Sequence, residues 1–195
     1  MIQTLAGRLA GFVIRNDDTA DREVLEYGLG LLISAIISYV VIFSSALLFG
    51  LFVEMLVTVA LYSTMRFIIG GSHANSKMVC EIMYTSSLYL LIIVSSVISL
   101  NVYVVTVLYV VNLALILKYA PGDTVQQPIA KGIFTRKLFG ILFLSLFFTL
   151  SIFVHETRVF ANLLLLVPTL TSVFLHPIIY NIMGCKRSKI REVSS

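Results

Sequence analysis

Residues 82–117, IMYTSSLYLLIIVSSVISLNVYVVTVLYVVNLALIL, form the longest stretch of the chain without a charged side chain. As one α-helix, this stretch would be about 54 Å long, whereas the hydrocarbon core of a bilayer is about 30 Å thick. The stretch therefore predicts two membrane spans, and Ser99, Leu100 and Asn101 offer the turn between them.

The rest of the chain has the same character. Hydrophobic residues make up 58% of the 195 residues and charged residues 12%, and a soluble fold of this length could not bury so many apolar side chains. Two cysteines exclude a disulfide-rich secreted domain, and a net charge of +4 is too small to indicate a nucleic-acid partner. We predict an all-α polytopic integral membrane protein whose six spans are 28–48, 51–69, 79–99, 102–118, 138–155 and 159–183.

The basic residues predict the orientation of these spans. With six spans, both termini lie on one side of the membrane, and only Arg158 falls on the opposite side. The connections on the first side hold the other basic residues, thirteen against one, so both termini are expected to be cytoplasmic. These residues are Arg8, Arg15, Arg22, Arg66, Lys77, Lys118, Lys131, Arg136, Lys137, Lys186, Arg187, Lys189 and Arg191.

The N-terminal segment differs from the spans because it is amphipathic. Its apolar residues fall near one helical face, which predicts an interfacial helix that anchors the chain or grips a partner helix; they are Ile2, Leu5, Leu9, Phe12 and Val13. We therefore divide the chain into an amphipathic segment (1–27), a six-helix transmembrane domain (28–183) and a basic cytoplasmic tail (184–195).

The loop between the second and third spans contains a histidine close to a cysteine. In one continuous helix His73 and Cys80 would lie about 10.5 Å apart along the axis, too far for proton transfer. The glycine pair at 70–71 indicates that the chain is not helical there, so His73 can lie in a turn while Cys80 lies in the first turns of the third span. Asn75 or Ser76 would cap that helix.

This arrangement predicts a nucleophile–base pair at the inner membrane surface, because a helix N-terminus and a nearby imidazolium both favour a thiolate. Spacing alone also allows the ordinary alternative, a small apolar cysteine and a solvated histidine. Cys185, beside Lys186 and Arg187, is a rival nucleophile without a histidine near it in sequence. We expect no metal or cofactor, because two candidate ligands do not make a zinc site. His176, before Pro177, is expected to be a hydrogen-bonded packing residue.

Further polar residues surround the predicted pair. Asp123 either orients His73, as the third member of a nucleophilic triad does, or only caps a turn. Arg66 carries a planar fork of donors suited to a carboxylate or a developing oxyanion. The basic residues of the second cytoplasmic loop can meet lipid phosphates or acidic side chains of a peptide substrate; they are Lys131, Arg136 and Lys137.

The two loops together resemble the accessory gene regulator B family. The pattern is Arg66-x4-Gly71-x-His73-Ala74-x-Ser76-x3-Cys80, followed by Tyr119-Ala120-Pro121 and Pro128-Ile129 after the fourth span. The family's catalytic histidine and cysteine fall on His73 and Cys80, and its required arginine and glycine fall on Arg66 and Gly71. Where family members can carry a run of lysines, this chain has Val125, Gln126 and Gln127.

The resemblance implies a membrane-embedded cysteine endopeptidase of Gram-positive quorum sensing, with its active site on the cytoplasmic side of the cell membrane. Its substrate would be a propeptide with an amphipathic leader, an internal cysteine and an acidic tail. Cleavage of the tail through a thioester on Cys80 would permit thiolactone cyclisation of the autoinducing peptide precursor. The resemblance also implies a homodimer. The alternatives are a small six-span peptide transporter or exporter, and a non-catalytic membrane scaffold.

Overall fold

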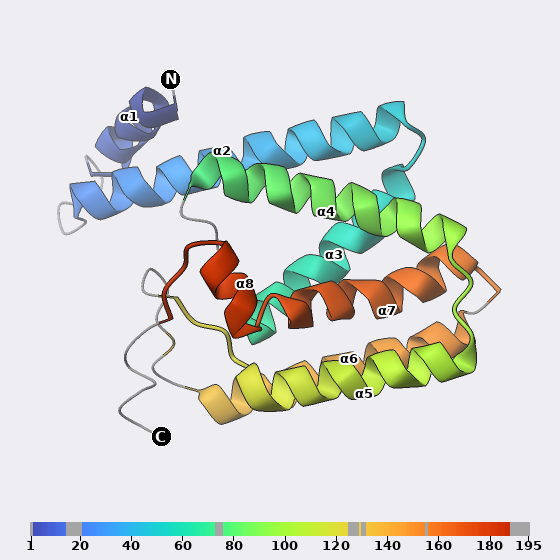
Figure 1. Cartoon of the computed structure of the whole chain (residues 1–195). Helices are drawn as coiled ribbons and strands as arrows, with labels where there is room; N and C mark the ends of the chain where they lie inside the picture. The colour runs from blue at the N-terminus through green and yellow to red at the C-terminus, as the bar shows by residue number, and fades with distance from the viewer. Residues whose placement is uncertain are drawn as a thin grey trace. The chain divides into compact units, whose positions relative to one another are not determined.

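The structure, a computed structural model, describes residues 2–14, 21–72, 76–124, 129, 132–154 and 156–187. Within these residues its regular elements are α-helices, and an isolated β-bridge joins Gly70 to Gly122. The helices are α1 (Ile2–Ile14), α2 (Arg22–Leu48), α3 (Phe52–Ile69), α4 (Lys77–Val97), α5 (Val102–Tyr119), α6 (Ile133–Phe153), α7 (Arg158–Val173) and α8 (Pro177–Ile182) (Figure 1). The chain forms two compact units, residues 1–52 and 53–195. The predicted division at residues 27 and 183 is based on the expected boundaries of the membrane spans instead, and it stays a prediction.

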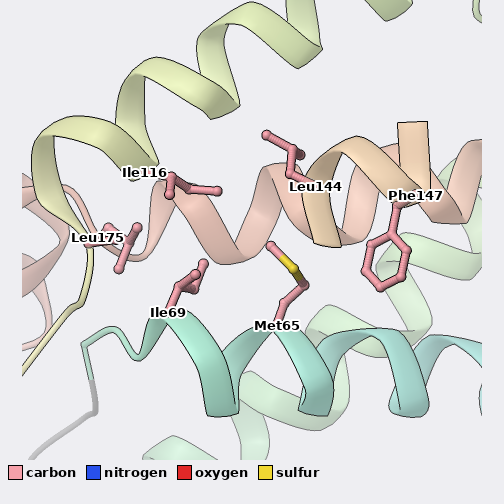
Figure 2. Close-up of a cluster of buried hydrophobic side chains, with 7 residues drawn as sticks. Met65, Ile69, Ile116, Leu144, Phe147 and Leu175 are labelled. Carbon is pink, nitrogen blue, oxygen red and sulfur yellow. The ribbon is translucent and has the colours of Figure 1, made fainter. Parts of the chain in front are cut away.

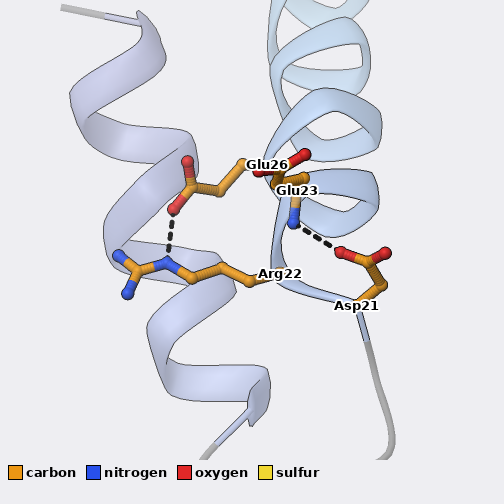
Figure 3. A network of polar contacts seen from close by, with 4 residues as sticks. All are labelled: Asp21, Arg22, Glu23 and Glu26. Carbon is orange, nitrogen blue, oxygen red and sulfur yellow. Dashed lines mark hydrogen bonds and ion pairs between the residues drawn. The ribbon is translucent and has the colours of Figure 1, made fainter.

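The first unit contains α1 and α2. Asp21 caps the start of α2 by accepting a hydrogen bond of 2.9 Å from the Glu23 backbone N–H, and Arg22 and Glu26 form an ion pair of 2.8 Å one turn further (Figure 3). α2 ends in a Schellman motif, in which Gly50 adopts φ 70° and the Leu51 N–H bonds the Ala46 carbonyl at 2.8 Å.

Helix α1 packs on α2 through its small residues, because Ala6 and Ala10 are buried. Its large apolar side chains are exposed, Phe12 at 67%; they are Leu5, Leu9, Phe12 and Val13. A helix with an exposed apolar face is therefore confirmed here, and its placement at a membrane interface stays a prediction.

In the second unit, α7 is the most buried helix and contacts α4, α5 and α6. Polar bonds join these helices: Asn112 of α5 donates to Thr169 of α7 at 2.8 Å, and Tyr109 of α5 pairs with Ser145 of α6 at 2.9 Å. A core cluster lies where α3, α5 and α6 meet Leu175, the second residue after α7 (Figure 2). It contains Met65, Ile69, Ile116, Ala120, Leu144, Phe147 and Leu175.

The predicted turn in the long apolar stretch is confirmed. α4 ends at Val97 and α5 begins at Val102, with Asn101 capping α5 through a 2.9 Å bond from the Val104 N–H. Among the described residues, five helices, α2 to α6, are long and apolar enough to cross a membrane.

The structure divides the predicted last span, 159–183, into two helices. α7 has 16 residues and ends at Val173, and α8 begins at Pro177. Proline disfavours helical geometry in the residue before it. His176 is accordingly extended, with φ −71° and ψ 136°. Its ring nitrogen accepts a 3.3 Å bond from the Ile178 N–H, which confirms His176 as a hydrogen-bonded structural residue. A sixth span and the side of the termini stay predictions.

Candidate functional site at the end of helix α3

The chain leaves α3 through two glycines that no other residue could replace without strain. Gly70 has φ 70° and Gly71 has φ 135°, both in the region that favours glycine. A Cβ on Gly70 would lie 2.1 Å from the Gly122 carbonyl oxygen, and a Cβ on Gly71 would lie 2.0 Å from Nη1 of Arg66. The backbone around these glycines is therefore fixed by contacts as well as by dihedral angles.

A short parallel bridge joins this segment to the loop after α5. The Gly71 N–H donates to the Gly122 carbonyl at 3.1 Å, and the Gly122 N–H donates to the Ile69 carbonyl at 2.7 Å. The next residue, Ser72, donates its N–H to the Phe174 carbonyl at 3.1 Å. Three segments distant in sequence, 69–72, 122 and 174, thus meet at one point.

Arg66 holds this junction together from the last turn of α3. Its guanidinium donates to the carbonyl oxygens of Gly70, at 3.3 Å, and of Ser72. The guanidinium carbon also lies 5.4 Å from the centre of the Phe174 ring. The planar fork of donors thus serves the loop that leads to His73. Lysine has one ammonium group and could not reproduce this set of contacts.

Two buried polar groups lie beneath the bridge. Asp123 is 3% exposed and Tyr180, on α8, is 2% exposed. A Cβ on Gly122 would lie 2.7 Å from the Tyr180 hydroxyl, so this hydroxyl lies directly against the bridge. Within the part of the chain that the structure describes, neither Oδ1 of Asp123 nor the Tyr180 hydroxyl has a hydrogen-bond partner. Such buried groups call for a partner, because leaving them unpaired is costly.

The Tyr180 hydroxyl remains protonated at physiological pH. A tyrosine hydroxyl ionises only at about pH 10. Tyr180 therefore contributes a neutral hydroxyl that can donate a hydrogen bond.

The C-terminal segment closes the same junction, which the sequence analysis missed. Arg187 donates to the Leu175 carbonyl at 2.5 Å, and its guanidinium carbon lies 4.7 Å from the Tyr180 ring centre and 5.7 Å from that of Tyr119. The Cys185 N–H donates to the Tyr180 carbonyl at 2.9 Å. A basic pair after the last apolar run indicates only topology, and no sequence signal predicts that one of its members stacks on two tyrosines.

The predicted nucleophile is placed as expected. Cys80 is half-buried in the first turn of α4, and its N–H donates to the Ser76 carbonyl at 3.0 Å. Ser76 occupies the N-cap position, but its side chain makes no capping hydrogen bond. His73 and Asn75 lie outside the described residues, so the pairing of Cys80 with His73 stays a prediction.

Two of the three basic residues predicted to contact the substrate, Arg136 and Lys137, lie among the described residues. Arg136 donates to the Phe67 carbonyl at 3.0 Å, and Lys137 donates to the Leu117 carbonyl at 2.7 Å. These bonds satisfy carbonyls near the ends of α3 and α5. Lys131, Pro128 and residues 125–127 lie outside the described residues. In the described part of the chain, no group of three or more His, Cys, Asp or Glu residues could hold a metal ion.

Apolar helices that meet at a polar, glycine-rich junction define the class of the molecule, a polytopic membrane protein with a candidate site at one end of its bundle. Comparison with known proteins is more specific. The chain belongs to the accessory gene regulator B family, whose pattern matches residues 6–178, and this family serves in quorum-sensing accessory gene regulation.

Relatives of the chain are found in staphylococci and clostridia. It is 28% identical to accessory gene regulator protein B of Staphylococcus haemolyticus, over 78% of this chain and 81% of the relative. The match to accessory gene regulator protein B of Staphylococcus epidermidis is 29% identical and covers 82% of each. A putative AgrB-like protein of Clostridium perfringens is 31% identical, and the match spans 58% of this chain but only 56% of that relative. No significant match to a solved structure is found.

Proposed function

We propose that this chain is a membrane-embedded cysteine endopeptidase that cleaves the C-terminal tail from a quorum-sensing propeptide. The observation that carries the proposal is the placement of Cys80 in the first turn of α4, after a loop whose start, Gly70 to Ser72, is fixed by Arg66 and Gly122. The described loop ends one residue before His73. A nucleophile on a helix and a base on a clamped loop can be held in a fixed relation.

In the proposed reaction, His73 accepts the thiol proton of Cys80, and the thiolate attacks the carbonyl carbon of the scissile peptide bond. The C–N bond breaks, the leaving amine takes the proton from His73, and the tail departs. The acyl group remains on Cys80 as a thioester. The thiol of the propeptide's internal cysteine then attacks this thioester, forms the thiolactone and releases Cys80. This exchange of thioesters is nearly balanced, whereas hydrolysis runs downhill, so the site must keep water out.

The supporting residues have distinct roles in this proposal. Arg66 and Gly71 are positioning residues, since their contacts shape the loop before His73. Asp123 orients His73 through its unpartnered buried oxygen, and Tyr180 lies beside it as a further positioning residue. Ser76 begins the helix that carries Cys80. Lys131, Arg136 and Lys137 contact the acidic tail of the substrate.

The proposal places the chain in the cell membrane of a Gram-positive bacterium, with both termini and the site on the cytoplasmic side and with six spans. Its partners are a propeptide that has an amphipathic leader, the lipid bilayer and a second copy of the chain. The AgrB-like names of the relatives and the apolar helices support this placement.

Cleavage in membranes tests the proposal. A propeptide with an internal cysteine, an acidic tail and a C-terminal epitope tag is co-expressed with the chain, and release of the tag is followed by immunoblot. Cys80→Ala and His73→Ala should each abolish release, with no further loss in the double variant, because coupled residues are not additive. Cys185→Ala, the matched control for the rival cysteine, should retain release. Tag release by Cys80→Ala would refute the proposal and leave the transporter or the scaffold.

A further inference from the structure

A cavity of about 510 Å³ lies at the opposite end of the second unit from Arg66. It is formed where the turn between α4 and α5, the end of α6 and the start of α7 come together. α7 has 16 residues and is about 24 Å long, shorter than the ~30 Å core of a bilayer. This short central helix does not fill the end of the bundle, and its first residue, Arg158, lies at the cavity.

The walls of the cavity combine an apolar interior with one cationic group. Val105, Ile152 and Leu165 supply apolar surface, and among the described residues of the lining only Arg158 carries a charge. Within the described parts of the chain, no ion pair or hydrogen bond of the Arg158 guanidinium is found. The cavity therefore matches an anionic group attached to a hydrocarbon.

Hydrogen bonds fix the helices that form the cavity. The cavity also opens onto the surface that these helices present to lipid. Asn162 donates hydrogen bonds to the carbonyls of Ser95, at 2.8 Å, and of Ile98, at 2.7 Å, which tie α7 to the end of α4. Val102 and Ile152 line the cavity and are also well exposed on the outside of their helices. A hydrocarbon chain lying against these helices can thus enter the cavity from the side.

We propose that this cavity binds an anionic phospholipid, with the phosphate on Arg158 and one acyl chain between α5 and α7. Guanidinium and phosphate match in charge and geometry, since the fork of arginine can donate two parallel hydrogen bonds to phosphate oxygens. The apolar walls accept the chain, and the volume lies within the usual range for small-molecule sites. This site is separate from the cleavage site of the proposed function.

Lipid binding to the purified full chain in detergent tests the proposal by native mass spectrometry. Phosphatidylglycerol should bind at least about tenfold more tightly than phosphatidylcholine with the same acyl chains, the effect of one charge-assisted contact. Arg158→Gln should abolish this preference, whereas Arg8→Gln, which removes one basic charge from α1, should retain it. Ala161→Phe, which fills the cavity, should weaken binding of both lipids.

Three results would overturn the proposal. The first is equal binding of the two lipids to the unaltered chain, and the second is an intact preference in Arg158→Gln of normal helix content. The third is binding of soluble glycerol phosphate as tight as that of phosphatidylglycerol, because it would show a site for free anions with no part for the acyl chain.

Discussion

The two ends of the second unit differ in how closely their segments are packed. At the Arg66 end, backbone bonds and glycine contacts join segments 69–72, 122 and 174, and no Cβ fits on Gly70, Gly71 or Gly122 without displacing a neighbour. At the Arg158 end, the helices diverge around a cavity of about 510 Å³. Chemistry needs positions held within fractions of an ångström, whereas a site for a lipid chain needs volume. The contrast agrees with the proposed reaction at the first end and the proposed lipid binding at the second.

Among the variants that compare the two ends, Gly71→Ala is expected to have the largest effect. The new Cβ would lie 2.0 Å from Nη1 of Arg66 and would also demand a φ of 135° from alanine. Displacement of the loop before His73 should lower the rate of propeptide cleavage by about a hundredfold. Gly50→Ala is the matched control: Gly50 also has a positive φ but has no neighbour within 4 Å of a Cβ, so it should lose about 1 kcal/mol of stability and keep its cleavage rate. Equal rates for the two variants would show that the contact with Arg66 is unimportant.

Arg66→Lys should have the next largest effect. Lysine keeps the charge that fixes orientation but loses the fork that binds the Gly70 and Ser72 carbonyls. We expect normal abundance in the membrane and cleavage reduced by about tenfold or more, the scale of ~1.4 kcal/mol. Arg22→Lys, in an exposed ion pair, should change neither quantity. Normal cleavage by Arg66→Lys would leave Arg66 as a topological charge only.

A smaller effect is expected from Tyr180→Phe. If the unpartnered hydroxyl had no role, its removal would be neutral or stabilising. If the hydroxyl is a positioning group, its removal should lower the cleavage rate about fivefold, which corresponds to the net value of one hydrogen bond. Thermal stability should not fall. Tyr109→Phe, which breaks the bond to Ser145 away from the site, should instead lower stability and leave the rate unchanged. A rate unaffected by Tyr180→Phe would remove Tyr180 from the site.

The smallest effect is expected at the Arg158 end. Ala161→Leu adds volume at the wall of the cavity, and it should change the cleavage rate by less than about twofold, because distant sites act independently. Ala120 is fully buried in the core cluster near Gly122. Ala120→Leu should therefore overpack the Arg66 end and cost about 1–3 kcal/mol of stability. Similar losses of activity in both variants would erase the distinction between the two ends.

Sequence reasoning predicted the features that depend on local patterns. The uncharged stretch and Asn101 located the turn between α4 and α5, and the glycine pair located the end of α3. Cys80 was placed correctly at the start of a helix.

Features that depend on long-range contacts were not predictable in this way. The approach of Gly122 to Gly71, the contact of Tyr180 with Gly122 and the stacking of Arg187 on Tyr119 join residues about 50 to 70 positions apart, and no local pattern encodes them. The division of the predicted last span was missed because apolar composition outweighed the signal of Pro177.

In the proposed reaction, Cys80 carries the acyl group during cleavage. Replacing the internal cysteine of the propeptide by alanine blocks the second step, so the acyl-enzyme should accumulate and be visible by intact-protein mass spectrometry. We predict an adduct with the mass of the propeptide without its tail, removed by hydroxylamine as a thioester is, and located by peptide mapping at Cys80. An adduct at Cys185, or tail release with no adduct at either cysteine, would show that Cys80 is not the nucleophile.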